Sequence, residues 1–290
     1  MHHFTATTWL SFPRAETLRH IWQVEVPKLG LEYPFVMHQV LAVAALHLVF
    51  LHPDGHQRYA HHAFRHQTEA LAGIRQSITN ITKENCEAIF AASCLLLISA
   101  FATSSRSKDW LEQAQTPTIR DIVDVFSLIR GMYEIHSCSQ NYLHRGKFAP
   151  FFEAQSALPP SSVLEETRQQ LGSLWISISS CSNSGVICRE IDVLLHWIQH
   201  CEATTTDPEL RVTMTWPIYM STEYISLLIS RDSAALILLA HYCAVARTTE
   251  ASAWYMKNWG RTALRAISES LDPAWEPYIQ WPRAMISDGC

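Results

Sequence analysis

The segment YPFVMHQVLAVAALHLVFL, residues 33–51, decides the fold class. Pro34 suits the first turn of a helix, where its missing N–H costs little. From there to Leu51 the segment is apolar on nearly all helical faces, which is typical of a helix buried all round. Residues 86–102, CEAIFAASCLLLISAFA, repeat this character. The two segments predict two central helices around which the rest of the chain packs.

The remaining chain also favours helices, since it has only nine glycines and few alternating strand patterns. We therefore expect an all-α protein whose residues 1–290 form a single domain, with a less regular segment at 138–162 as a boundary or lid. The predicted helices cover residues 15–26, 34–51, 57–81, 86–102, 119–135, 163–180, 185–201, 208–230, 233–246 and 254–271. For the helix at 57–81 the expected core stripe is Tyr59, Phe64, Leu71, Ile74 and Ile78.

Charge is scarce: 17% of the 290 residues are charged, against about 25% in an ordinary soluble domain. Such a composition fits a large interior, an apolar cavity or a surface that packs on a partner, including a second copy in a homodimer. The net charge is −5, and no basic block is present. Because nucleic-acid binding rests on Lys and Arg neutralising phosphates, we expect no direct nucleic-acid contact by this chain.

No motif for a metal or cofactor is evident. The eight cysteines include no C-x-x-C pair, so the sequence offers no zinc cluster, and glycine-rich nucleotide loops are missing as well. The start, Met1 to Thr5, lacks the pattern of a signal peptide, and the longest apolar run, residues 40–51, is interrupted by His47 and is short for a membrane span. We expect a soluble, intracellular protein of the cytoplasm or nucleus, with no membrane span, metal or cofactor.

The clustered histidines allow two interpretations, a metal site and an ordinary solvent-exposed helix face. His62 and His66 share a helix face at the spacing of zinc ligands, but no third ligand is evident, so a solvated face is favoured. His38 and His47 lie in the apolar segment, where a core role with a hydrogen-bond partner is favoured over ligand contact. Asp232 or Ser233, just before an apolar helix, is expected to act as its N-cap.

Several stretches resemble the fungal-specific transcription factor domain of the sterol uptake control group. They are Met1 to Phe4, PFVMHQVLAVAALHL (34–48), YAHHAFRHQTEAL (59–71) and ENCEAIFAASCLLLISAFA (84–102), followed by SLLISRDSAALILLAHYCA (226–244) and several tryptophans. The resemblance implies an all-α fold with an internal hydrophobic pocket. In sterol-sensing members that pocket accepts ergosterol, and a separate zinc cluster, which this sequence lacks, binds DNA.

The resemblance makes a ligand pocket the favoured interpretation of the aromatic residues, which line apolar sites and orient ligands. We expect an apolar ligand, such as a sterol, terpenoid or polyketide. The residues expected to line its pocket are Phe35, His38, Leu41, Phe90, Ser93, Leu97, Trp216, Tyr219, Tyr224, His241, Trp254 and Trp259.

Two functions follow from such a pocket. The first is a ligand-sensing domain that controls transcription of fungal metabolism genes. The alternative is a stand-alone, cofactor-independent cyclase, isomerase or dehydratase of secondary metabolism, in which His38, Asp232 and His241 would be the catalytic candidates. A third hypothesis is a pure interaction module.

Overall fold

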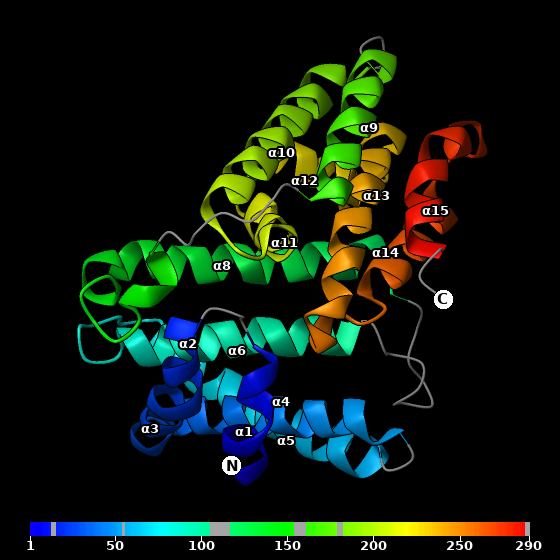
Figure 1. The fold of residues 1–290 in the computed structure, drawn as a ribbon. Coiled ribbons are helices and arrows are strands. Elements are labelled where there is room, and N and C mark those ends of the chain that lie inside the picture. Colours follow the sequence, from blue (N-terminus) through cyan, green and yellow to red (C-terminus); the bar gives the residue numbers. More distant parts are fainter. Residues whose placement is uncertain (13–15, 54–55, 105–116, 154–160, 179–181, 288–290) are drawn as a thin grey trace. The chain divides into compact units, whose positions relative to one another are not determined.

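The computed structural model describes all residues except 13–15, 54–55, 105–116, 154–160, 179–181 and 288–290, and the described part is helical without strands (Figure 1). This confirms the all-α fold class. The chain forms two compact units, one mainly from residues 1–114 and 128–153 and the other mainly from 154–251 and 256–290. The prediction of one domain stays a prediction, because two compact units can still fold cooperatively.

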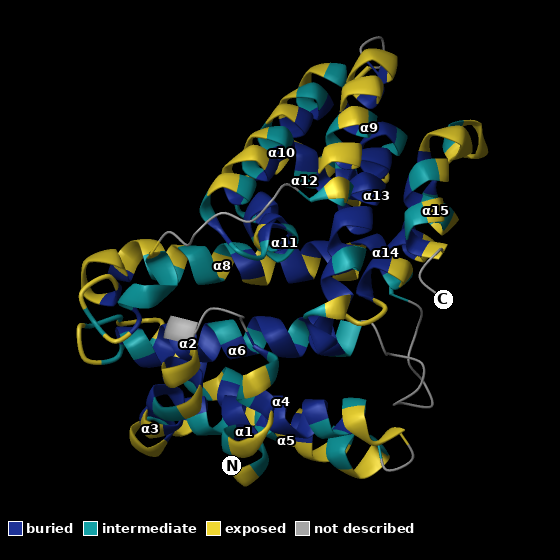
Figure 2. Ribbon diagram, in the orientation of Figure 1, coloured by how far each residue is buried: buried dark blue, intermediate teal, exposed yellow. Residues whose placement is uncertain are grey.

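The first unit is built around α4 (Pro34–Leu51), whose buried residues lie on all its faces. Its neighbours include α1 (His2–Ala6), α3 (Val26–Glu32), α5 (His56–Ser77) and α6 (Cys86–Ser104). α6 is likewise buried over most of its length (Figure 2). The two apolar segments of the sequence are therefore both core helices of this unit, as predicted.

Both helices have the length and composition of a membrane-spanning segment, and so has the bent pair formed by residues 222–251 if it is counted as one span. Within the structure, however, 61% of the α4 window and 72% of the α6 window are buried. Burial inside a protein core accounts for the apolar sequence of α4 and α6.

The segment before α4 was predicted to be a single helix that ends near Pro27, and the structure differs from this. α2 (Glu16–His20) runs into a π-helical turn at Ile21–Glu25 and then into α3. Pro27 does not end the helical run, because it directly follows the π-helical turn and its missing N–H falls at the junction of two helical segments rather than inside one α-helix. Glu25, nearly buried in this turn, pairs with Lys147 at 2.9 Å and with Lys28 at 3.0 Å, and these two lysines lower the pKa of its carboxyl.

α5 is shorter than predicted, and its buried residues are Ala63, Ala70 and Ile74. Ile74 is thus the confirmed member of the predicted stripe, whereas Phe64 is 71% exposed and Ile78 is 42% exposed. The reason is the close approach of α5 to α4. A Cβ atom added at Gly73 would lie 2.6 Å from the Cβ of Phe35, so this face admits small side chains and turns Phe64 outward.

α8 (Ile119–Leu143) contributes its first residues to the second unit and the remainder to the first. It continues eight residues beyond the predicted end at 135, so the first part of the less regular segment at 138–162 is helical, and a 3₁₀ turn follows at Ala149–Phe152. Residues 136–145 contain no glycine or proline that would end the helix earlier. At Gly146 the Glu87 carboxylate comes close enough to accept a hydrogen bond from the backbone N–H of Lys147 at 2.7 Å. Residues 154–160 of the predicted lid lie outside the described residues.

The second unit packs around α13 (Ser233–Thr248), in which every residue from Ala234 to Ala246 is buried. The helices in contact with α13 are α9 (Ser162–Ile178), α10 (Ser184–Thr204), α11 (Pro208–Tyr219), α12 (Thr222–Ile229), α14 (Trp259–Ser270) and α15 (Gln280–Ser287). α13 is dark along nearly its whole length in Figure 2. Short 3₁₀ turns at Thr249–Ala251, Trp254–Met256 and Pro273–Ile279 join the last helices.

Two predicted boundaries in this unit are wrong. Residues 208–230 form two helices, because the backbone of Met220 is extended and the Ser221 hydroxyl then caps α12 by accepting from the N–H of Tyr224. Residues 254–271 begin with a 3₁₀ turn, and α14 starts after Asn258, whose φ of 65° lies in the left-handed region. The sequence pattern also did not predict α15.

We expect the replacement Gly73→Ala to destabilise the protein by about 1–3 kcal/mol, since the added methyl group overpacks the contact between α4 and α5. Gly131→Ala is the matched control, because nothing lies within 4 Å of a Cβ at that position in α8. Removing a helical glycine there is expected to stabilise by about 0.5–1 kcal/mol. Urea unfolding followed by circular dichroism measures both changes, and equal stabilisation by the two alanines would contradict this account of α5.

Candidate functional site

The predicted ligand residues of the first unit lie in several separate surroundings rather than around one pocket. Phe35 packs beside Tyr33 and Gly73, whereas His38 pairs with His66 of α5, their Nδ1 atoms 2.9 Å apart. His66 is only partly exposed, and both burial and His38 lower its pKa. The prediction of a solvated histidine face is therefore wrong for His66. Among the described residues, no three His, Cys, Asp or Glu side chains converge as metal ligands.

Phe90 lies at the centre of an aromatic cluster in the first unit. Its ring is 5.6–5.9 Å from those of Phe148, Phe151 and Phe152. His136 and His144 join the same cluster, with their Nε2 atoms 3.1 Å apart. The remaining predicted residues of α4 and α6 behave as core: Ser93 donates to the carbonyl of Ile89, Leu97 is buried and Leu41 is half-buried.

His47 packs beneath the N-terminal helix of the first unit. Its Nδ1 is 3.1 Å from the Thr8 hydroxyl, and its ring lies 5.3 Å from that of His3 and 4.9 Å from that of Trp254. Burial, and secondarily His3, lower the pKa of His47 to about 4. This supports the core role favoured from the sequence and places the predicted Trp254 beside a histidine of α4.

An aromatic cluster in the second unit, which we call the Trp216 cluster, gathers three of the predicted residues around Tyr242. The Tyr242 ring is 4.9 Å from that of Trp216 and 6.2 Å from that of Trp259, and the Trp216 ring is 5.7 Å from that of Tyr224. Trp216, Tyr224 and Tyr242 are fully buried. The two tyrosine hydroxyls donate to backbone carbonyls, Tyr224 to Ala235 and Tyr242 to Thr213.

His241 was predicted to line the pocket. In the structure, however, it is the next residue of α13, Tyr242, whose ring lies in the Trp216 cluster. His241 lies on another face of α13, where its Nδ1 bonds the carbonyl of Ile237 and its ring stacks on Trp281 at 5.5 Å. Burial lowers its pKa to about 4. Tyr219 is also outside the cluster, since it is 41% exposed and stacks on Trp197.

Two buried polar atoms near Tyr224 have no hydrogen-bond partner. They are the indole Nε1 of Trp216 and Oε2 of Glu190, on α11 and α10. Glu190 is 2% exposed, its other oxygen accepts from the N–H of Ser221, and after burial it is the largest cause that raises the pKa of Tyr224. An unpaired buried donor and acceptor are unusual, because leaving one unpaired costs about 1–3 kcal/mol.

Sequence reasoning missed Glu190. A usable signal was present, since Glu190 falls on the buried face of α10, between Ile187 and Leu194. A carboxylate on the apolar stripe of an amphipathic helix needs a partner, which makes it a candidate for function.

Asp232 caps α13 by accepting from the N–H of Ala235 at 3.0 Å and also accepts from the Asn183 amide. This confirms the N-cap interpretation. Asp232 and His241 are nine residues apart on this element, about 14 Å along the helix axis, so they do not form a catalytic pair.

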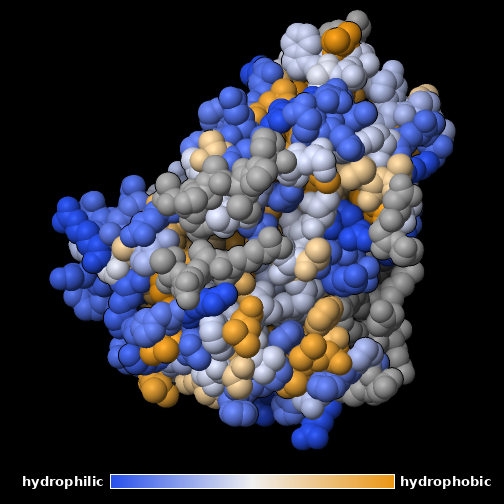
Figure 3. Space-filling model, viewed as in Figure 1, coloured by the Kyte–Doolittle hydropathy of each residue, from blue (hydrophilic) through white to orange (hydrophobic). Residues whose placement is uncertain are grey.

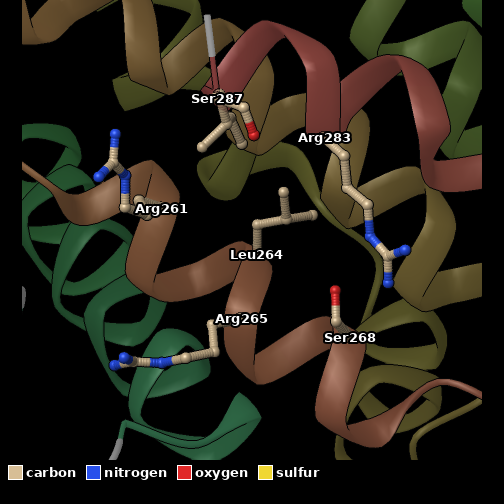
Figure 4. Close-up of a pocket in the computed structure, with 7 residues that line it drawn as sticks. Arg261, Leu264, Arg265, Ser268, Arg283 and Ser287 are labelled. Atoms are coloured by element: carbon tan, nitrogen blue, oxygen red, sulfur yellow. The ribbon is translucent and has the colours of Figure 1, made fainter. Parts of the chain in front are cut away.

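An open pocket of about 490 Å³ lies between α14 and α15 (Figure 4). Arg261, Leu264, Arg265 and Ser268 line it from α14. α15 contributes Arg283, Ile286 and Ser287. None of the predicted ligand residues lines this pocket, and the internal apolar pocket stays a prediction.

Lowering the pH from 7 to 5 is expected to destabilise the protein, because His47 and His241 are held neutral. Their folded pKa of about 4 lies below the ordinary value of 6.5, so only the unfolded chain takes up protons between these values. The stabilisation is complete above pH 6.5 and is lost as the pH falls towards 4, by about 1–2 kcal/mol per histidine at pH 5. Urea midpoints at the two pH values measure this loss.

The variant His47→Asn retains a side-chain nitrogen for Thr8 but does not titrate. We expect a smaller stability difference between pH 7 and pH 5 in this variant. His62→Asn, on the exposed face of α5, should leave the difference as in the parent protein. An unchanged pH dependence in His47→Asn would refute the role given to His47.

Comparison with known proteins agrees with the resemblance seen in the sequence. Residues 2–123 match the family described as "Fungal specific transcription factor domain". The chain is 24% identical over 252 residues, 83% of its length, to the Zn(2)-C6 fungal-type transcription factor afumD of Aspergillus fumigatus, and 23% identical over its whole length to a Zn(2)-C6 fungal-type transcription factor of Gibberella zeae. It spans 65% and 61% of the lengths of these two relatives.

A third relative is named for sterol uptake control, the group that the sequence resembles. Sterol uptake control protein 2 of Saccharomyces cerevisiae is 30% identical over 105 residues, which cover 36% of this chain and 11% of that protein. These matches support the resemblance: residues 2–123 match the fungal specific transcription factor domain, and the chain is similar over most of its length to fungal-type Zn(2)-C6 transcription factors.

Proposed function

We propose that this chain is an intracellular regulatory domain that senses an apolar, hydroxyl-bearing ligand and controls transcription. The similarity to fungal transcription factors supports the regulatory role. The relative named for sterol uptake control supports a sterol or terpenoid as the class of ligand. The observation that carries the ligand part is the pair of unpartnered polar atoms at the edge of the Trp216 cluster.

A ligand hydroxyl has the chemistry that this pair lacks. It can accept a hydrogen bond from the Trp216 indole N–H and donate one to the Glu190 carboxylate, while a fused-ring or isoprenoid body packs on Trp216, Tyr224 and Tyr242. When the ligand hydroxyl bonds the Trp216 nitrogen and the Glu190 oxygen, the free-energy cost of burying these two atoms without partners is removed in the bound protein and remains in the free protein. A ligand with this preference for one conformation shifts the population towards it, which is how binding becomes a signal.

We place the ligand in the second unit because a buried donor and a buried acceptor there both lack a partner, whereas the predicted residues of the first unit offer one such atom, the indole Nε1 of Trp254. In the first unit, His38 is paired with His66 and Ser93 bonds Ile89. In the second unit, by contrast, Trp216 and Glu190 both have capacity left. A ligand can enter between α10, α11 and α12 only if these helices separate slightly. Small helix shifts of this kind are a common form of conformational switch.

The full chain should show a higher melting temperature with ergosterol or a terpenoid alcohol than without ligand. The methyl ether of the same sterol serves as the chemical control, since its oxygen cannot donate to Glu190. We expect its affinity to be about tenfold or more lower, the equivalent of one lost hydrogen bond to a charged group. If neither sterols nor terpenoid alcohols raise the melting temperature, the proposal is wrong.

Two substitutions locate the site. Glu190→Gln and Trp216→Phe keep approximate shape but change the polar groups, and each is expected to weaken binding about tenfold. Asp192→Asn and Trp175→Phe are matched controls, because Asp192 is exposed on α10 and Trp175 is 43% exposed on α9. Equal losses in the test and control variants would place the ligand elsewhere.

The regulatory part has a separate readout. The chain fused to a heterologous DNA-binding domain should change reporter expression when the ligand is supplied, and the Glu190→Gln fusion should respond only at higher ligand concentration. Reporter expression that is insensitive to a ligand shown to bind would exclude sensing.

A further inference from the structure

We propose that the pocket between α14 and α15 binds a small amphipathic organic anion, with a carboxylate or phosphate group on a short apolar body. This site is distinct from the Trp216 cluster, and its ligand chemistry differs from that of a neutral sterol. The proposal stands on the charge, the size and the apolar floor of the pocket.

The charge of the pocket is opposite to that of the chain. Arg261, Arg265 and Arg283 line it and no acidic side chain does, in a protein whose net charge is −5. Arg261 and Arg265 are four residues apart on α14, so they share a helix face, where like charges are mutually destabilising. A bound anion removes that repulsion, and guanidinium groups recognise carboxylates and phosphates through paired N–H donors.

Arg283 already binds a carboxylate at the edge of the pocket. Its Nη2 donates to Oε1 of Glu276 at 3.1 Å, and the side chains of this pair are 38% and 55% exposed. Such an exposed pair contributes little to stability, so a ligand anion can replace Glu276 at small cost. Arg265 is exposed and has no hydrogen-bond or ion-pair partner among the described residues, which leaves its donors available.

The floor of the pocket is apolar. Leu264 is 7% exposed and Ile286 is 2% exposed, and both line it. In Figure 4, Leu264 lies between Arg261 and Arg265 on one side and Arg283 with Ser268 on the other. In Figure 4 the guanidinium groups of Arg261 and Arg265 extend away from Leu264, so these side chains have to turn towards a ligand that rests on it. The hydroxyls of Ser268 and Ser287 add neutral donors.

The volume sets the size of the ligand. About 490 Å³ falls within the range of about 300–1,000 Å³ that is typical of small-molecule sites. The pocket is open to solvent and much too small for a nucleic-acid segment or a protein surface. Figure 3, which shows one face of the molecule, has its apolar residues in separate small groups, so a confined pocket rather than a broad apolar surface is the feature to test.

Titration calorimetry of the full chain with octanoate, octyl phosphate and 1-octanol tests the proposal. These probes share the apolar body and differ in the head group. We expect one or both acids to bind at least tenfold more tightly than the alcohol and more weakly as salt is added. A preference between the two acids identifies the anionic group. Equal affinity for acids and alcohol, or no binding of either acid, would overturn the proposal.

Substitutions assign the binding to this pocket. Arg265→Gln and Arg283→Gln are each expected to lower octanoate affinity about tenfold or more, whereas Arg265→Lys, which keeps the charge, should lower it less. Arg189→Gln is the control, because Arg189 is an exposed arginine of α10 in the same unit and does not line the pocket. A loss in Arg189→Gln that equals the loss in Arg265→Gln would show adventitious binding only. Sterol binding by Arg265→Gln should be unchanged, which separates this site from the Trp216 cluster.

Discussion

A helix that is apolar on all its faces must be covered on all its faces, and this constraint organises both units. α4 in the first unit and α13 in the second have buried residues on all their faces, and each contacts several helices rather than one. Exposing the apolar side chains of either helix would forfeit about 1.5–3 kcal/mol for each large residue. The amphipathic helices supply the cover, since each has an apolar stripe that needs such a surface.

Polar groups inside these packed units are mostly satisfied locally, and the exceptions are informative. Tyr224 and Tyr242 donate to carbonyls of neighbouring helices, and Asp232 caps the helix that it precedes. Several buried polar atoms lack a partner, and among them the Trp216 indole nitrogen and one Glu190 oxygen are a donor and an acceptor beside Tyr224. The open pocket between α14 and α15 is distinguished by its charge, since three arginines and no acidic side chain line it in a chain of negative net charge, with Glu276 paired to Arg283 at its edge.

The two proposed sites require opposite ligand chemistry. A buried indole N–H and a carboxylate oxygen suit one neutral hydroxyl group in a water-excluded cluster, whereas exposed guanidinium groups over an apolar floor suit an anion that remains partly hydrated. Both sites lie within the second unit and share α13 as a neighbour of their helices. A regulatory domain with two such sites can respond to two classes of metabolite.

The sequence by itself determined the all-α class, most of the helices and both apolar helices of the first unit, because period and composition are local properties that a buried helix must satisfy. It also predicted a cap at Asp232 or Ser233, and the structure shows that Asp232 is the one that accepts the hydrogen bond. Only the tertiary structure decided which face of each helix is covered. Phe64 looked like core but faces solvent because α5 approaches α4 through Gly73, and α13 turns Tyr242, rather than His241, towards Trp216. Glu190 and the arginine pocket became visible only when α10, α11, α14 and α15 were placed, since a site depends on side chains that distant segments bring together.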